Sequence, residues 1–370
     1  MKKVWDKWTR IALVKRILVG LILGAILGIA VPQATGIAIL GDVFVSALKA
    51  IAPLLVFFLV ISSLCNAGKS HGGVIKTVII LYMFSTVLAA VIAVFASMAF
   101  PVKMTLANAA TDTSAPQGIV EVLNNLLLNV VANPVSSLVN ANYVGILMWA
   151  VLLGLAFRAA DKMTKKVLAD VADGISMVVT WIINLAPFGI FGLVFNTVST
   201  NGLDIFTTYG KLLLLLVGCM LFIYFVTNPL LVYWCIRQNP YPLIFHCLKR
   251  SALTAFFTRS SAANIPVNMK VCEEMGLDRD TYSVTIPLGA TINMDGAAIT
   301  ITVMTMATAF TLGIHVDIPT AIILSLLAAL SACGASGVAG GSLLLIPMAC
   351  SLFGISDDIS MQVVAVGFII

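Results

Sequence analysis

Charged side chains are scarce in this 370-residue chain. Lysine, arginine, aspartate and glutamate together make up 10% of the residues, whereas hydrophobic residues make up 60%. A soluble domain uses roughly 25% charged residues, so this composition excludes a soluble globular protein. Several apolar stretches reach the roughly 20 residues that an α-helix needs to cross a bilayer. The composition therefore predicts an all-α, polytopic membrane protein.

Cysteine and histidine are also few, with 7 and 3 residues respectively. The cysteines are odd in number, fall mostly within apolar segments and lack the spacing of metal ligands. We therefore expect neither a disulfide framework nor a resident metal or other cofactor. A catalytic triad could be drawn on paper from Ser260 or Ser261, His246 and Asp295. No base is placed beside either serine, however, so the sequence favours a protein that is not an enzyme.

Basic residues are absent after Arg279. Before it they form five clusters, at 2–16, 69–76, 158–166, 237–250 and 259–279. The net charge is +5, but short clusters between apolar stretches indicate topology and not a nucleic-acid-binding surface. Because lysine and arginine are enriched in cytoplasmic loops, this pattern predicts a cytoplasmic N-terminus.

Apolar stretches indicate where the chain crosses the membrane. They predict spans near 11–31, 43–67 and 74–100, a broken region over 118–157, and further spans near 167–198 and 208–236. With the N-terminus inside the cell, the clusters at 69–76, 158–166 and 237–250 all fall in loops on the cytoplasmic side, as the positive-inside rule requires.

The last third of the chain breaks this pattern. The stretch 241–270 is basic on both flanks and has a polar centre, "TRSSAANIP", so we expect it to enter and leave the membrane on one side. A full span is predicted at 282–312. The stretch 318–353 again has a polar centre, "SACGASGVAGGS", and a last apolar run covers 358–370. This order is typical of an inverted-topology repeat, although small residues also mediate ordinary helix packing.

One carboxylate lies inside the span 282–312, in the run "TINMDGAAITI". An ionised Asp near the bilayer centre costs roughly 2.5–3.5 kcal/mol, so Asp295 needs a partner. Gly296 makes local unwinding easier, which would let Asn293 and Asp295 face one site. Oxygen ligands of this kind suit a hard cation. Protonation of Asp295, or an ion pair with lysine or arginine, is the alternative.

A second polar set lies in the span 74–100. Tyr82, Ser85 and Thr86 are three and four positions apart, so they share one face of a helix. Hydroxyl groups in membrane helices often bond only to their own backbone, and from spacing alone that interpretation is the better one.

Three motifs occur in order along the chain: "TRSSAANIPVNMK" (258–270), "PLGATINMDGAA" (287–298) and "GASGVAGGS" (334–342). Together they resemble the sodium:dicarboxylate and amino-acid symporter family, over nearly the whole chain. The resemblance implies an eight-span transporter of a bacterial inner membrane with two re-entrant helical hairpins, at 241–270 and 318–353. Its last span would be truncated here, at 358–370.

The resemblance also implies a homotrimer in which each subunit has a fixed scaffold and a mobile transport domain. The first two spans (1–73) and most of 101–236 would form the scaffold. The third span (74–100) and the transport core (237–370) would form the transport domain, and the sixth span near 208–236 could belong to either.

Sodium ligands carry over by position from the same resemblance. They are Tyr82, Ser85, Thr86, Asn293 and Asp295 for one site, Gly289 and Asn293 for a second, and Thr291 with the carbonyls of Ala332, Cys333 and Ala335 for a third. Substrate contacts carry over in the same way. They are Arg259, Ser260 and Ser261 at the first tip, Met294 and Ala297 at the central motif, and Val338, Gly341 and Ser342 at the second tip.

Two departures from the family pattern bear on the substrate. Members that carry acidic substrates have Thr directly after "NMDG", where this chain has Ala297. The missing hydroxyl favours sodium-coupled symport of a small neutral amino acid, such as serine or threonine. Ala339 stands where many members have Pro. A sodium- or proton-coupled dicarboxylate or glutamate carrier of the same family is the nearest alternative, and an ion channel a more distant one.

Overall fold

A computed structural model describes residues 13–66, 73–104, 106, 127–128, 130–202, 204–252, 255, 261, 264–333 and 340–369. The elements in these ranges are helical, and no strand occurs among them. The longer helices are α2 (Leu13–Ala30), α3 (Ile39–Asn66), α4 (Gly73–Ala99), α7 (Tyr143–Ala156), α8 (Lys162–Asn184), α9 (Ala186–Asn201), α10 (Asp204–Phe222), α15 (Arg279–Ile292), α16 (Asp295–Thr311), α17 (Ile318–Ala332) and α19 (Asp357–Ile369). The shorter ones are η1 (Thr35–Ala38), α6 (Pro134–Val139), η2 (Phe157–Ala159), η3 (Ile223–Thr227), α11 (Asn228–Ile236), α12 (Tyr241–Cys247), η4 (Leu248–Ala252), α14 (Ile265–Glu274), η5 (Leu343–Leu345) and α18 (Ile346–Ser351).

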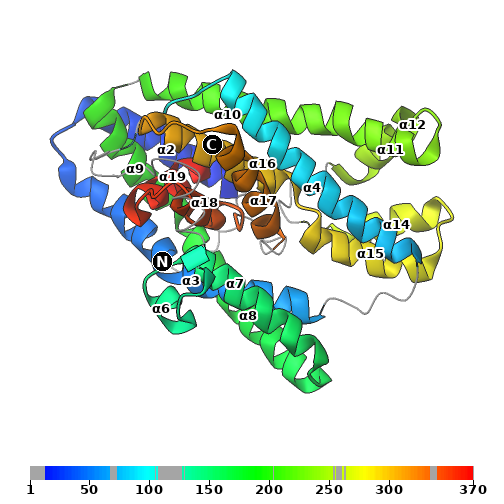
Figure 1. The fold of residues 1–370 in the computed structure, drawn as a ribbon. Coiled ribbons are helices and arrows are strands. Elements are labelled where there is room, and N and C mark those ends of the chain that lie inside the picture. Colours follow the sequence, from blue (N-terminus) through cyan, green and yellow to red (C-terminus); the bar gives the residue numbers. More distant parts are fainter. Residues whose placement is uncertain are drawn as a thin grey trace, which may run out of the picture.

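The helices associate in two groups (Figure 1). In the first, α2 packs along α9, and α3 packs against α7, α8 and α9. In the second, α16 packs against α4, α17 and α18, and α15 also contacts α4. α10 contacts α4, α16 and α9, so the sixth predicted span touches both groups. Further contacts join the two groups, between α18 and α7 and between α19 and both α3 and α9. The division into a scaffold and a transport domain, and their relative motion, stay predictions.

α16 is largely enclosed by other helices of the second group. Ala298, Ile301 and Met304 are among a run of its side chains that are fully buried. Small and apolar side chains on several faces of this helix pack against α4, α17 and α18. The central position of α16 therefore fixes the depth of its first residue, Asp295, inside the protein.

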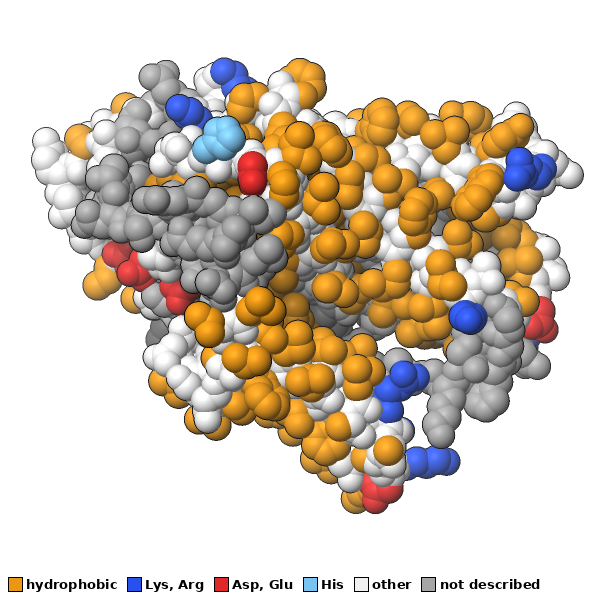
Figure 2. Space-filling view, viewed as in Figure 1, with side chains coloured by type: hydrophobic (Ala, Val, Ile, Leu, Met, Phe, Trp, Pro, Cys, Tyr) orange, Lys and Arg blue, Asp and Glu red, His pale blue; other side chains and the backbone are white. Residues whose placement is uncertain are grey.

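Apolar side chains also cover the outside of the molecule. Figure 2 shows them over much of the visible face, with charged side chains toward its margins. Five helical stretches are long and apolar enough to cross a membrane: 35–66, 76–99, 162–184, 207–236 and 281–311, counted over the described residues. The expectation of a multi-pass membrane protein is confirmed at this level.

The prediction that 167–198 forms one continuous span was wrong. The stretch 167–198 divides into α8 and α9 at Leu185, and α8 begins earlier than predicted, at Lys162. Pro187 lies in the first turn of α9, where its ring and missing N–H fit best, although Pro53 and Pro287 lie inside α3 and α15. The predicted span 208–236 corresponds to α10, η3 and α11, with a π-helical turn at Ile223–Thr227.

The arms of the first predicted hairpin lie against each other. Ser251 in η4 contacts Asn264 and Asn268 beside α14, and Arg250 pairs with Glu274 at 3.6 Å. The arms of the second hairpin are α17 and α18, joined by a sulfur contact of 3.4 Å from Ser331 to Met348. Re-entry into the membrane from one side stays a prediction for both hairpins.

Glycines permit the closest helix approach in the first group. Gly20, Gly24 and Gly28 form a stripe on α2 that faces the backbone of α9, and a Cβ added at Gly24 would lie 2.6 Å from the Phe191 carbonyl oxygen. Because backbone cannot move aside as a flexible side chain does, even alanine would force the two helices apart.

We therefore predict that Gly24→Ala lowers the free energy of unfolding by about 1–3 kcal/mol, the usual cost of overpacking. Gly174→Ala on α8 is the matched control, since a Cβ there meets no atom within 4 Å. Thermal unfolding of the purified protein in detergent would measure both. A melting temperature of Gly24→Ala equal to that of the control would contradict the predicted packing.

Candidate functional site

The helix that carries the "NMDG" run is interrupted. α15 ends at Ile292, and Asn293 and Met294 have φ/ψ angles of −102°/80° and −117°/53° before α16 begins at Asp295. The predicted unwinding is therefore confirmed. The negative end of one helix dipole and the positive end of the next meet at this break. Backbone groups there lose their helical partners and become available to a ligand.

Two hydroxyl groups of α4 meet the Asp295 carboxylate. The Ser85 hydroxyl donates to Oδ2 at 2.6 Å, and Thr86 Oγ1 lies 3.2 Å from Oδ1. Thr86 is fully buried and Ser85 is 9% exposed. The face of α4 that these residues share thus lies against the broken helix. Their hydroxyl groups contact Asp295 and not only the backbone of α4.

The Thr86 hydroxyl has one proton to donate but three neighbouring oxygen atoms. Its Oγ1 lies 3.0 Å from the Tyr82 carbonyl, 3.3 Å from Asn293 Oδ1 and 3.2 Å from Asp295 Oδ1. A hydroxyl donates one proton, so at most one of these pairs is a hydrogen bond. The remaining oxygens face each other without a proton, an arrangement that a small cation stabilises by lying between them.

No fixed cation neutralises Asp295 among the described residues. The ion pair recorded there joins Arg250 to Glu274, away from the break. The alternative of an ion pair between Asp295 and a lysine or arginine therefore finds no support in this part of the chain.

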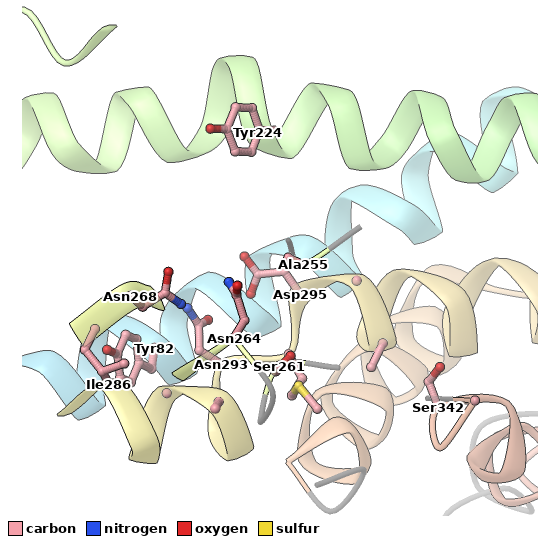
Figure 3. Close-up of a pocket in the computed structure, with 16 residues that line it drawn as sticks. Tyr82, Tyr224, Ala255, Ser261, Asn264, Asn268, Ile286, Asn293, Asp295 and Ser342 are labelled. Carbon is pink, nitrogen blue, oxygen red and sulfur yellow. The ribbon is translucent and has the colours of Figure 1, made fainter. Parts of the chain in front are cut away.

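A cavity of about 700 Å³ opens beside the break (Figure 3). It is lined by residues of α4, η3, both predicted hairpins and the broken helix: Tyr82, Tyr224, Ala255, Ser261, Asn264, Asn268, Ile286, Gly289, Ala290, Asn293, Met294, Asp295, Gly296, Ala297, Gly340 and Ser342. In Figure 3, Tyr224 lies across from Asn264, Asn293 and Asp295. The cavity thus joins the oxygen cluster to a space large enough for a small organic solute.

The second hairpin touches the break through Cys333. Its sulfur lies 3.4 Å from the Ile292 carbonyl oxygen, 3.3 Å from the Ala329 carbonyl oxygen of its own helix and 3.7 Å from the Met83 sulfur on α4. The Thr291 hydroxyl, in contrast, donates to the Leu288 carbonyl of its own helix at 2.8 Å. The tip end of the first arm of this hairpin, the broken helix and α4 are therefore in direct contact at one point.

A comparison with known proteins identifies the family of this chain. The model of the sodium:dicarboxylate symporter family matches residues 13–370. The chain belongs to this family. It is 58% identical to the serine/threonine transporter SstT of Bifidobacterium adolescentis, over 100% of this chain and 86% of that protein. It is 54% and 55% identical to proteins of the same name from two strains of Streptococcus thermophilus, over 100% of this chain and 92% of each.

The structure brings most of the predicted ion ligands that it describes together. Tyr82, Gly289, Asn293 and Asp295 line the cavity, and the hydroxyl groups of Ser85 and Thr86 lie within 3.2 Å of the Asp295 carboxylate. Of the predicted substrate contacts, Ser261, Met294, Ala297 and Ser342 line the cavity, whereas Gly340 does so in place of Gly341. Ala332 is buried on α17. Arg259, Ser260, Ala335 and Val338 lie outside the described residues. The role of each as a ligand stays a prediction.

Sequence reasoning missed several residues of the cavity wall. Asn264 and Asn268 come from the first hairpin, Tyr224 from the π-helical turn η3, and Ile286 from α15. The run "NIPVN" offered a signal, since two amides in a membrane segment need polar partners. No sequence signal placed Tyr224 opposite the broken helix.

We predict that Thr86→Val raises the sodium concentration for half-maximal uptake about tenfold, or about 1.4 kcal/mol, because valine keeps the shape and removes the ligand oxygen. Ser97→Ala is the matched control. Ser97 is a buried hydroxyl on the same helix that bonds only to the Ala93 carbonyl, at 2.7 Å. Sodium titrations of uptake in liposomes would measure both, and equal shifts in the two variants would contradict the assignment.

Proposed function

We propose that this protein is a secondary active transporter that carries small neutral amino acids, serine and threonine, into a bacterial cell together with Na⁺. Its membership of a sodium symporter family and its 54–58% identity to transporters named for serine and threonine support this function. The structural observation that supports it best is the Asp295 carboxylate at a helix break, surrounded by oxygen atoms and without a fixed cation among the described residues.

The ion is proposed to bind among the oxygens of Asp295, Asn293, Ser85 and Thr86, with Tyr82 beside them. Gly289 would contribute to a second ion site, and Thr291 with the carbonyls of Ala332, Cys333 and Ala335 to a third. Sodium accepts carboxylate, amide, hydroxyl and carbonyl oxygens alike. Each bound ion would offset the cost of an anion and unpaired carbonyls at membrane depth. The protein needs no resident cofactor in this proposal, since Na⁺ is cargo.

The substrate is proposed to bind in the adjoining cavity. Ser261, Met294, Ala297 and Ser342 line it, and Arg259, Ser260, Val338 and Gly341 would complete the contacts. Ala297 offers no hydroxyl to a second carboxylate on the substrate. A small neutral side chain is therefore favoured over the dicarboxylate of other family members.

Coupling would operate through the second hairpin. Cys333, near its tip, contacts the Ile292 carbonyl at the break, so an ion that orders the break would also change what the hairpin packs against. Substrate and ions would together favour the closed hairpin, and reciprocity between the two sites then follows from linkage. The transport core would move across a scaffold held in a homotrimer.

The entry of Na⁺ supplies enough free energy to accumulate a neutral substrate. One Na⁺ that crosses ~100 mV contributes about 2.3 kcal/mol, and a tenfold concentration gradient adds about 1.4 kcal/mol. A thousandfold accumulation of a neutral solute costs about 4.1 kcal/mol. One ion nearly meets this cost and two exceed it.

We predict sodium-dependent uptake of radiolabelled serine by liposomes that contain the protein. Replacement of Na⁺ by choline should abolish uptake, and so should Asp295→Asn, because the amide keeps the shape of the carboxylate but loses its charge. Uptake that persists in choline medium would reject sodium coupling, and flux that fails to saturate with serine would favour a channel.

A further inference from the structure

Asn264, a residue of the cavity wall, has a side-chain oxygen without a hydrogen-bond partner among the described residues. The residue is 4% exposed and lines the cavity beside Asn293 and Asp295 (Figure 3). This oxygen is the buried Oδ1 atom. A buried acceptor without a partner destabilises a protein, and such groups are few in folded proteins.

A hydrogen-bonded relay fixes which atom of the amide is left over. Ser251 Oγ lies 2.5 Å from Asn268 Oδ1 and 2.6 Å from Asn264 Nδ2. Ser251 has a single proton, which it donates to Asn268 Oδ1. Asn264 must then donate its N–H to Ser251, which leaves Oδ1 as the free acceptor.

Helix capping does not account for this asparagine. Asn264 is the N-cap residue of α14, a position where asparagine normally accepts a bond from a backbone N–H of the first turn. Its side chain makes no such bond here, and Pro266 removes one of the possible donors. The oxygen is therefore held away from the usual capping geometry.

The chemistry of the free atom restricts its ligand. An amide oxygen accepts a proton and repels a carboxylate. The amide at Asn264 lies one turn from Ser261, a predicted substrate contact, because its backbone N–H donates to the Ser261 carbonyl at 3.2 Å. A hydroxyl on the substrate side chain would provide the missing donor, and an aliphatic side chain of the same size would not.

We infer that Asn264 is a specificity-determining residue, whose Oδ1 accepts the hydroxyl proton of the transported amino acid. The inference rests on the proposed function and extends it, since it gives the reason for a preference for serine over alanine. A site built to bond a substrate hydroxyl rejects the analogue that lacks it, because its own polar group then stays unpaired.

The test is competition against uptake of radiolabelled serine by the reconstituted protein. Unlabelled L-serine, L-alanine and β-chloro-L-alanine, which is close to serine in size but has no O–H donor, are the competitors. In the wild-type protein serine should compete about tenfold better than either analogue, the factor that about 1.4 kcal/mol provides. β-Chloroalanine that competes as well as serine would overturn the inference without any variant.

Asn264→Leu should bring the ratio of serine to alanine inhibition constants close to one. Ser251→Ala is the matched control, because it breaks the same relay and keeps the Asn264 oxygen, so most of the preference should remain. An equal loss of affinity for serine and alanine in Asn264→Leu would assign the residue to the substrate ammonium, to an ion or to hairpin structure, and would overturn the inference. Absence of sodium-dependent serine uptake in the wild-type protein would instead reject the proposed function itself.

Discussion

The structure depends on how one half-buried carboxylate is compensated. Asp295 lies at the start of α16, a helix with many buried side chains, and the hydroxyl groups of Ser85 and Thr86 lie beside its oxygens. These groups can orient around an ionised carboxylate but cannot remove its charge. In the proposed function a bound cation would do so, and it would also relieve the close approach of Thr86 to three oxygen atoms. Ion binding and the local fold would therefore both depend on compensation of the same carboxylate charge.

The remaining elements of the site follow from this requirement. The break between α15 and α16 exposes carbonyls that a continuous helix would have used. α4 places its hydroxyls opposite the break, and the Cys333 thiol brings the second hairpin to the same point. Because these elements touch one another as well as the cavity, a change of occupancy at the break reaches the hairpin through direct contacts.

The broken helix could be predicted from the sequence, because a lone Asp beside Gly in a long apolar run gains oxygen partners where the helix opens. The partnership of Ser85 with Asp295 could not be derived from spacing, since 210 positions separate them; resemblance to a family suggested it. Hydropathy also missed the break at Leu185, where the residues stay apolar and only Pro187 marks the new helix. The tip residues Arg259 and Val338 lie outside the described residues, so these substrate contacts stay predictions.

Binding of sodium, separate from transport, tests the central claim most directly. A ligand that binds only the folded state stabilises it by RT ln(1 + [L]/Kd), about 2.7 kcal/mol at a hundredfold excess over Kd. Sodium, compared with choline at equal ionic strength, should raise the melting temperature of the wild-type protein in detergent, and the D295N variant should lose that rise. A sodium-dependent rise of equal size in D295N would contradict the account.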